Sequence, residues 1–187
     1  ISRFAIGSIH RQRNVMAKKK KVGTELPDNF VGSNKNDVYD GLGGQDSISG
    51  MGGNDKLKGG TENDSVLGGK GNDKIWGNAG YDILSGDEGK DTLWGGSETD
   101  SFIFRVGGKF GIGSDVDIIK DIDTEGDDMD HIQVMSMDFN NLIDEFSDIM
   151  KHAKQVGDDV KIDFGHGDVL ILKDTSKSDL SAELFMF

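Results

Sequence analysis

The sequence contains no cysteine and no long apolar run, and each absence excludes a class of protein. Without cysteine the chain can build neither a disulfide framework nor a thiolate metal site, so any cross-link that stabilises it must come from another source. No apolar run approaches the roughly 20 residues that cross a membrane, and we expect no membrane span. The basic N-terminal residues are likewise not followed by an apolar stretch of signal-peptide type.

The motifs of two large hydrolase classes are also missing. None of the histidines lies in an H-E-x-x-H motif, which removes the zinc ligands of the common metalloproteases. No G-x-S-x-G motif is present, which removes the nucleophile of lipases. The four histidines are His10, His131, His152 and His166. We therefore expect no catalytic residue and no enzymatic activity of the chain by itself.

Positive charge is scarce outside the N-terminus. Residues 1–21 carry seven lysines and arginines and no acidic residue, whereas the remaining 166 residues hold 14 basic and 34 acidic side chains. The overall net charge of −13 therefore hides a body of net charge −20. Such a body repels nucleic acids and anionic lipids and attracts hard cations such as calcium.

A nine-residue unit repeats eight times between residues 32 and 103 without insertion or deletion. Its first position is always glycine, at residues 32, 41, 50, 59, 68, 77, 86 and 95. Its sixth position is always aspartate: Asp37, Asp46, Asp55, Asp64, Asp73, Asp82, Asp91 and Asp100. Its eighth position is always apolar: Tyr39, Ile48, Leu57, Val66, Ile75, Leu84, Leu93 and Phe102. A fixed short period of this kind predicts a solenoid.

The repeat predicts a parallel β-roll with two flat faces. The three residues around the eighth position form a short strand, and the Gly/Asp-rich residues before it form a tight turn in which glycine supplies positive φ angles. Two nonapeptides then close one coil, and about four coils stack with strands about 4.8 Å apart. The eight apolar residues point inward and form the whole interior of the roll.

The stacked aspartates make this roll unstable without a cation. Carboxylates one coil apart repel each other by about 1 to 3 kcal/mol per pair, and six such pairs oppose a typical domain stability of about 5 to 15 kcal/mol. Calcium accepts six to eight oxygen ligands in loose geometry, whereas magnesium demands a tighter octahedron. We expect about six full calcium sites, between Asp37 and Asp55, Asp46 and Asp64, Asp55 and Asp73, Asp64 and Asp82, Asp73 and Asp91, and Asp82 and Asp100. Folding is then coupled to calcium binding.

The units 41–49 (GLGGQDSIS), 50–58 (GMGGNDKLK) and 68–76 (GGKGNDKIW) resemble the hemolysin-type calcium-binding repeats of RTX proteins. The resemblance covers all 72 residues of the repeat block. It implies that the eight sixth-position aspartates ligate calcium and that turn carbonyls complete each shell. Lys35, Glu62 and Glu98 replace the usual glycine at the fourth position, and Lys35 leads us to expect a weak or empty site in the first turn.

After the repeats, the sequence predicts a small β-rich cap with one helix. Apolar residues favour strands at 116–122, at 132–134 and in a hairpin at 160–172, and a helix between Asn140 or Asn141 and Gly157. The stretches 115–123, 155–164 and 180–187 resemble the C-terminal cap of serralysin-type metalloproteases. A solenoid needs such a cover at its open end. The expected fold class is therefore all-β dominated, a calcium-bound parallel β-roll with a C-terminal cap. The expected domains are a flexible basic extension (1–31), the roll (32–103) and the cap (104–187).

The C-terminus resembles a type I secretion signal, in which an acidic residue is followed by hydrophobic ones, as in Glu183 to Phe187. The resemblance implies that a bacterial type I secretion apparatus is a partner and that the protein is extracellular. Cytosolic calcium is too low for weak extracellular-type sites, so the chain would remain unfolded for transport and fold outside.

Two alternatives to a simple calcium-binding module remain. The outward positions of one predicted face carry Lys56, Lys58, Lys74, Trp76 and Trp94, and the two tryptophans are expected to stack. Such a face could bind an anionic, alginate-like polysaccharide, as the calcium-binding modules of alginate epimerases share this repeat; alternatively, the tryptophans pack under the cap and the lysines only solubilise. The chain could also be the C-terminal part of a larger secreted metalloprotease or lipase.

Overall fold

The computed structural model describes residues 20–107, 115–136 and 145–187. The strands of the roll are β1 (Lys21–Val22), β2 (Asn29–Ser33), β3 (Val38–Gly43), β4 (Ser47–Met51), β5 (Lys56–Thr61), β6 (Ser65–Lys70), β7 (Lys74–Ala79), β8 (Ile83–Glu88), β9 (Thr92–Ser97) and β10 (Ser101–Val106). The remaining elements are β11 (Val116–Ile119), β12 (His131–Ser136), α1 (Phe146–His152), β13 (Ala153–Val156), β14 (Asp159–Gly165), β15 (Asp168–Leu172), the 3₁₀ turn η2 (Lys177–Asp179) and β16 (Phe185–Met186).

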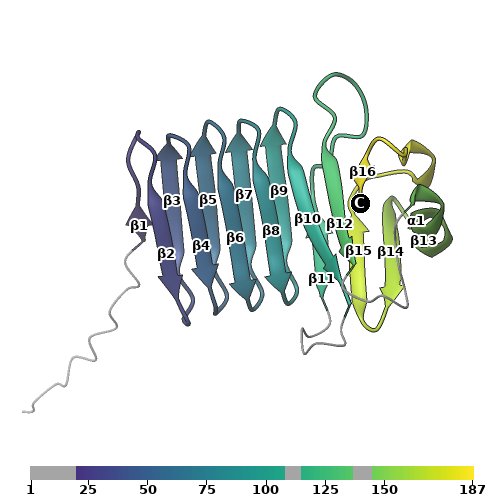
Figure 1. The fold of residues 1–187 in the computed structure, drawn as a ribbon, viewed down its shortest axis with the longest axis horizontal. Helices are drawn as coiled ribbons and strands as arrows, with labels where there is room; N and C mark the ends of the chain where they lie inside the picture. The colour runs from purple at the N-terminus through teal and green to yellow at the C-terminus, as the bar shows by residue number, and fades with distance from the viewer. Residues whose placement is uncertain (1–19, 108–114, 137–144) are drawn as a thin grey trace, which may run out of the picture.

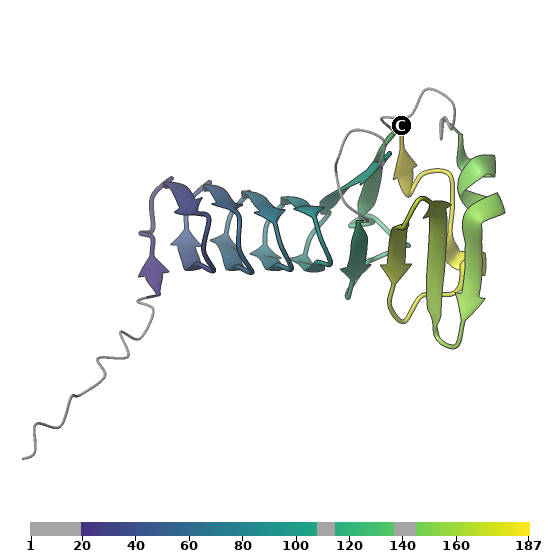
Figure 2. The same cartoon turned by 90° about the horizontal axis from the view of Figure 1, so that it is seen from below.

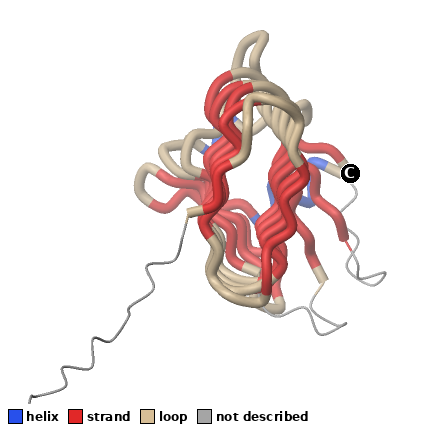
Figure 3. Tube along the Cα trace, turned by 90° about the vertical axis from the view of Figure 1, so that its left-hand side faces the viewer, coloured by secondary structure: helices blue, strands red, loops and turns tan. Residues whose placement is uncertain are grey.

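The predicted parallel β-roll is confirmed. Odd-numbered strands up to β11 lie in one sheet and even-numbered strands up to β12 in the other, and these strands stack in parallel along the roll (Figures 1 and 3). The register joins residues 18 apart, for example Tyr39 with Leu57 and Ile48 with Val66. Each coil therefore contains two nonapeptides, and the eight apolar residues of the eighth position are all buried.

The strands are longer than the three residues expected from the repeat. Strand β5, for example, begins at the seventh position of its unit and runs through the first three residues of the next unit. The first-position glycines allow this because their backbone is not left-handed in any unit, so the chain continues as strand. The positive φ angles lie at the second and fourth positions instead, as at Gly60 and Gly71.

The roll begins before residue 32, so the N-terminal extension expected to span residues 1–31 was too long. Strand β1 pairs with β3, and β2 pairs with β4, in the same register as later coils. Residues 23–31 form a ninth, degenerate unit with Gly23, Asp28 and Phe30 at the first, sixth and eighth positions. The Phe30 ring stacks on Tyr39 at 4.1 Å and closes the core at this end.

The cap continues both sheets and then covers the open end of the roll (Figure 2). Strand β11 follows β9 in one sheet, and the other sheet adds β12 after β10 and then β16. Strand β15 pairs with β11 in parallel, and β14 and β13 then follow in antiparallel order. The antiparallel pair of β14 and β15 confirms the predicted hairpin around Gly165 to Gly167. Phe104 and Phe164, from the roll and the cap, are 5.4 Å apart in one continuous core.

The predicted helix was partly wrong in its C-terminal boundary. It ends at His152, and residues 153–156 form β13, which pairs with β14 through a turn at Gly157 (φ 66°). Pairing Gln155 and Val156 with β14 satisfies backbone groups that a longer helix would leave at the sheet edge. The start predicted at Asn140 or Asn141 lies outside the described residues. No helix within the described ranges is long and apolar enough to span a bilayer.

Candidate metal centre

Carboxylates form a ladder along each edge of the roll. In this ladder, the backbone N–H of one sixth-position aspartate donates to Oδ1 of the aspartate 18 residues later. The N–H of Asp46 donates to Asp64 at 2.8 Å, and the N–H of Asp64 donates to Asp82 at 2.8 Å. The same bond joins Asp28 to Asp46, Asp37 to Asp55, Asp55 to Asp73, Asp73 to Asp91 and Asp82 to Asp100, at 2.6 to 2.9 Å. In each of these pairs, a backbone N–H therefore holds one oxygen of the later carboxylate in place.

The second carboxylate oxygen, Oδ2, is buried and accepts no hydrogen bond in six of these aspartates: Asp46, Asp64, Asp73, Asp82, Asp91 and Asp100. The residues themselves are at most 3% exposed. Burying an ionised oxygen without a partner costs several kcal/mol unless a counter-charge is supplied. A row of such atoms inside a folded domain therefore fits a bound cation.

Backbone carbonyls approach the same oxygens across the first-position glycines. A Cβ placed on Gly41 would lie 2.1 Å from Asp46 Oδ2 and 2.1 Å from the carbonyl oxygen of Gly59 in the next coil. At Gly50 the corresponding distances to Asp55 Oδ2 and the Gly68 carbonyl are 2.2 and 2.5 Å. Only glycine leaves room there, and the oxygens that converge are carboxylate and carbonyl, the ligand types that calcium prefers.

The pKa values of the ladder carboxyls are raised in the metal-free roll. Burial is the largest cause, backbone N–H bonds oppose it, and neighbouring carboxylates raise the values further. The pKa rises to about 6 at Asp64 and Asp73, to about 7 at Asp82 and Asp91, and to about 8 at Asp100. Each of these groups therefore needs either a proton or a cation to remain buried.

The first coil differs from the later ones. Oδ2 of Asp37 accepts hydrogen bonds from the backbone and the hydroxyl of Ser33, both at 2.8 Å. Oδ2 of Asp28 is bound in the same way by Thr24, at 2.6 and 3.0 Å. Neither Ser33 nor Lys35 has the positive φ of the later turns. The structure thus places Asp37 in the predicted row but gives its carboxylate a different environment from that of the other seven.

The ladder continues into the cap through residues that the repeat analysis missed. In one row, the N–H of Asp100 donates to Asp130 at 2.8 Å. In the other row, Asp117 takes the next place after Asp91, because Ile118 pairs with Thr92. The carboxylates of Asp91, Asp115 and Asp117 converge within 4.8 Å, and all three residues are buried. Burial raises the pKa of Asp115 to about 8 and that of Asp117 well above its usual range. The only sequence signal was an aspartate two residues before a buried apolar residue, without the glycine turn.

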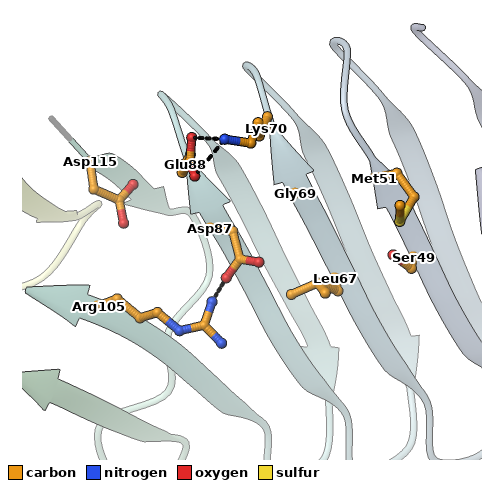
Figure 4. Close-up of a pocket in the computed structure, with 9 residues that line it drawn as sticks. All are labelled: Ser49, Met51, Leu67, Gly69, Lys70, Asp87, Glu88, Arg105 and Asp115. Carbon is orange, nitrogen blue, oxygen red and sulfur yellow. Dashed lines mark hydrogen bonds and ion pairs between the residues drawn. The ribbon is translucent and has the colours of Figure 1, made fainter. Parts of the chain in front are cut away.

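The outer face of the seven-stranded sheet is hollowed along β4, β6, β8 and β10, with Asp115 at the end nearest the cap (Figure 4). The hollow has a volume of about 380 Å³ and includes Leu67 and Met51 in its wall. Its cations are neutralised within the chain, since Lys70 contacts Glu88 at 3.0 Å and Arg105 is paired with Asp87. Among the described residues that line it, the hollow therefore offers no unpaired cation to a ligand.

A family model supports calcium binding by the repeats. Residues 31–66 and 67–102 each match the family model for the RTX calcium-binding nonapeptide repeat. Comparison with curated protein sequences gave no match. Among solved structures, the extracellular lipase LipA from Serratia marcescens is similar over 95% of this chain and 42% of its own, with 17% identity and a TM-score of 0.44. The chain thus spans less than half the length of that lipase.

Proposed function

Since residues 31–102 consist of RTX calcium-binding nonapeptide repeats, we propose that the chain is a secreted, non-catalytic module that folds when it binds extracellular calcium. The observation that carries the proposal is the row of buried Oδ2 atoms without hydrogen bonds. The proposed ligands are the seven sixth-position aspartates from Asp46 to Asp100, with Asp115 and Asp117 added at the junction to the cap. Asp37, whose Oδ2 accepts two hydrogen bonds from Ser33, is proposed as a weak end ligand. Calcium bound there would supply the positive charge that these carboxylates lack.

The ladder explains why folding would depend on the cation. Through one of its oxygens, each of these carboxylates accepts a hydrogen bond from a backbone N–H of the preceding coil. Stacking the coils therefore brings the carboxylate charges close together. The roll interior holds only one row of apolar side chains from each sheet, and their burial must offset both this repulsion and the entropy of ordering a glycine-rich chain. A roll with ionised, cation-free ladders therefore lacks the free energy to remain closed.

The placement of the C-terminus is consistent with export before folding. Leu184 and Phe185 are buried in the cap, and Phe185 pairs with Ile132 of β12. A transporter can read these residues only in a chain that has not yet folded. Low cytosolic calcium would keep the chain in that state, and higher extracellular calcium would end it.

Far-UV circular dichroism of the full chain tests this function. We expect little strand signal in excess chelator, full strand signal with millimolar calcium, and little response to the same concentration of magnesium. Full strand content in chelator would contradict the proposal. For export, deletion of Met186 and Phe187, which are 40% and 49% exposed, should leave calcium-dependent folding intact and reduce secretion by the type I apparatus. Unchanged secretion of this truncation would contradict the export role.

A further inference from the structure

Basic side chains gather on the outer face of the nine-stranded sheet of this acidic protein. Lys56 lies directly opposite Lys74, and Lys58 lies opposite Trp76, which in turn lies opposite Trp94. The row continues onto the cap, where Lys120 donates its backbone N–H to the carbonyl of Leu93. We call these six residues the lysine face: Lys56, Lys58, Lys74, Trp76, Trp94 and Lys120.

The lysines of the roll on this face form no ion pair in the described parts of the chain, and Asp40, which lies opposite Lys58, is paired with Lys20 instead. Five other lysines in the described parts of the chain form ion pairs, among them Lys70 with Glu88 and Lys173 with Asp159. Within those same parts, no ion pair is found for the exposed Lys56, Lys58 or Lys74. Like charges directly opposite each other destabilise a sheet, as Lys56 and Lys74 do here. In a protein of net charge −13, such a cluster calls for an external anion.

The tryptophans form a half-buried apolar floor within the lysine face. Their rings stack at 4.7 Å with an interplanar angle of 9°, and the ammonium of Lys58 lies 5.7 Å from the centre of the Trp76 ring. The predicted stacking of the two tryptophans is thereby confirmed. Because the two rings stack, each indole covers one ring face of the other. The exposed rims of these half-buried indoles offer apolar surface on which the C–H groups of a sugar ring can pack.

We propose that the lysine face binds a linear acidic polysaccharide made of uronic acid residues. The polymer would run along the roll axis, across the strands. Parallel strands are about 4.8 Å apart, a step comparable to the length of one pyranose residue. Successive strands would thus present one cation or indole to each sugar, with ammonium groups on carboxylates and indole rims on ring C–H groups.

This inference rests on the proposed function, because the side chains line up only in the folded roll. Binding should therefore require calcium even though the lysine face contains no ladder aspartate. Since the two failures must be separable, strand content has to be measured by circular dichroism in the same samples as binding.

Titration with short oligogalacturonates, at a free calcium concentration held constant by a buffer, tests the inference. We expect saturable binding by calorimetry and a change in tryptophan fluorescence. The double substitution Lys56→Gln with Lys74→Gln should weaken binding by at least about fivefold. Trp76→Phe keeps a stacked ring but reduces the rim and should also weaken it. Lys90→Gln, which changes an exposed lysine in a turn outside the lysine face, should leave binding unchanged.

Three results would overturn the inference. The first is a protein that folds fully in calcium but shows neither heat nor a fluorescence change. The second is equal binding by dextran sulfate or a DNA oligonucleotide, which would indicate charge alone. The third is an equal loss in the lysine-face and control variants. A chain that shows full strand content in excess chelator would instead refute the proposed function.

Discussion

The hydroxyl and the backbone N–H of Ser33 both donate to Oδ2 of Asp37, each at 2.8 Å. This pair closes one row of the carboxylate ladder with hydrogen bonds where a cation is proposed in later coils. Thr24 and Asp28 close the other row in the same way. At the opposite end, Oδ2 of Asp130 accepts the backbone N–H of Asp123 at 2.8 Å. The row from Asp28 to Asp130 is thus closed at both ends, whereas the row that begins at Asp37 ends at Asp115 and Asp117, each of which has one buried oxygen without a hydrogen bond.

Asp37 and Asp73 should differ in their need for charge. Asp37→Asn keeps an oxygen for Ser33, so we expect the calcium concentration at the folding midpoint to change by less than about twofold. Asp73→Asn removes a buried charge that two proposed sites share and should raise the midpoint by at least about tenfold. Circular dichroism during calcium titration measures both. Equal shifts would show that Asp37 ligates calcium as strongly as Asp73.

Gly50 and Gly52 lie close together in the chain and provide a matched pair of substitutions, which tests whether oxygens approach the first-position glycines too closely for a side chain. Gly50→Ala would place its Cβ 2.2 Å from Asp55 Oδ2 and 2.5 Å from the carbonyl oxygen of Gly68. Overpacking of this kind costs about 1 to 3 kcal/mol, and here it also displaces proposed ligands. Gly52→Ala meets its nearest atom at 3.6 Å and should cost well under about 1 kcal/mol. Urea unfolding in saturating calcium measures the stability of both variants. Similar losses of stability would contradict the close approach of the oxygens at Gly50.

The second position of the repeat carries strain that substitution can relieve. Leu42 and Met51 adopt φ angles of 78° and 73°, a region that costs L-residues about 1 to 2 kcal/mol. Since glycine also costs entropy, Leu42→Gly or Met51→Gly should stabilise the calcium form by about 0.5 to 1 kcal/mol. Ser33→Gly, at the same repeat position in the first coil, should destabilise it because Asp37 loses a hydroxyl donor. Thermal unfolding reads out the sign of each change.

Without calcium, acid should partly replace the metal. The folded-state pKa values of about 6 at Asp64 to about 8 at Asp100 lie above the value of about 3.9 for an unfolded aspartate. Such groups stabilise the fold below pH about 4, and this stability is lost as the pH rises through about 6 to 8. Calcium-free protein should therefore show more strand signal at pH 4 than at pH 8. The calcium affinity should instead fall with acid, because protons compete for the same carboxylates.

The repeat period predicted the roll because an uninterrupted spacing of nine residues leaves only one register. Tyr39, Leu57 and Ile75 had to stack, and they do. The coil around Asp28 was missed because Thr24 and Glu25 replace small turn residues and disguise the period. Asp117 and Asp130 were missed because they keep the spacing to a buried apolar residue but lack the glycines. The role of Ser33 depends on a turn conformation that residue identity alone does not determine.

Hydrogen exchange of the ladder amides tests the central claim most directly. The N–H groups of Asp46, Asp64 and Asp82 donate to carboxylates of the next coil, so they report the stacking itself. The account predicts that these amides exchange freely in excess chelator and become protected together as calcium saturates the roll. Protection of the same amides in chelator, at neutral pH, would show that the coils stack without a cation and would contradict the account.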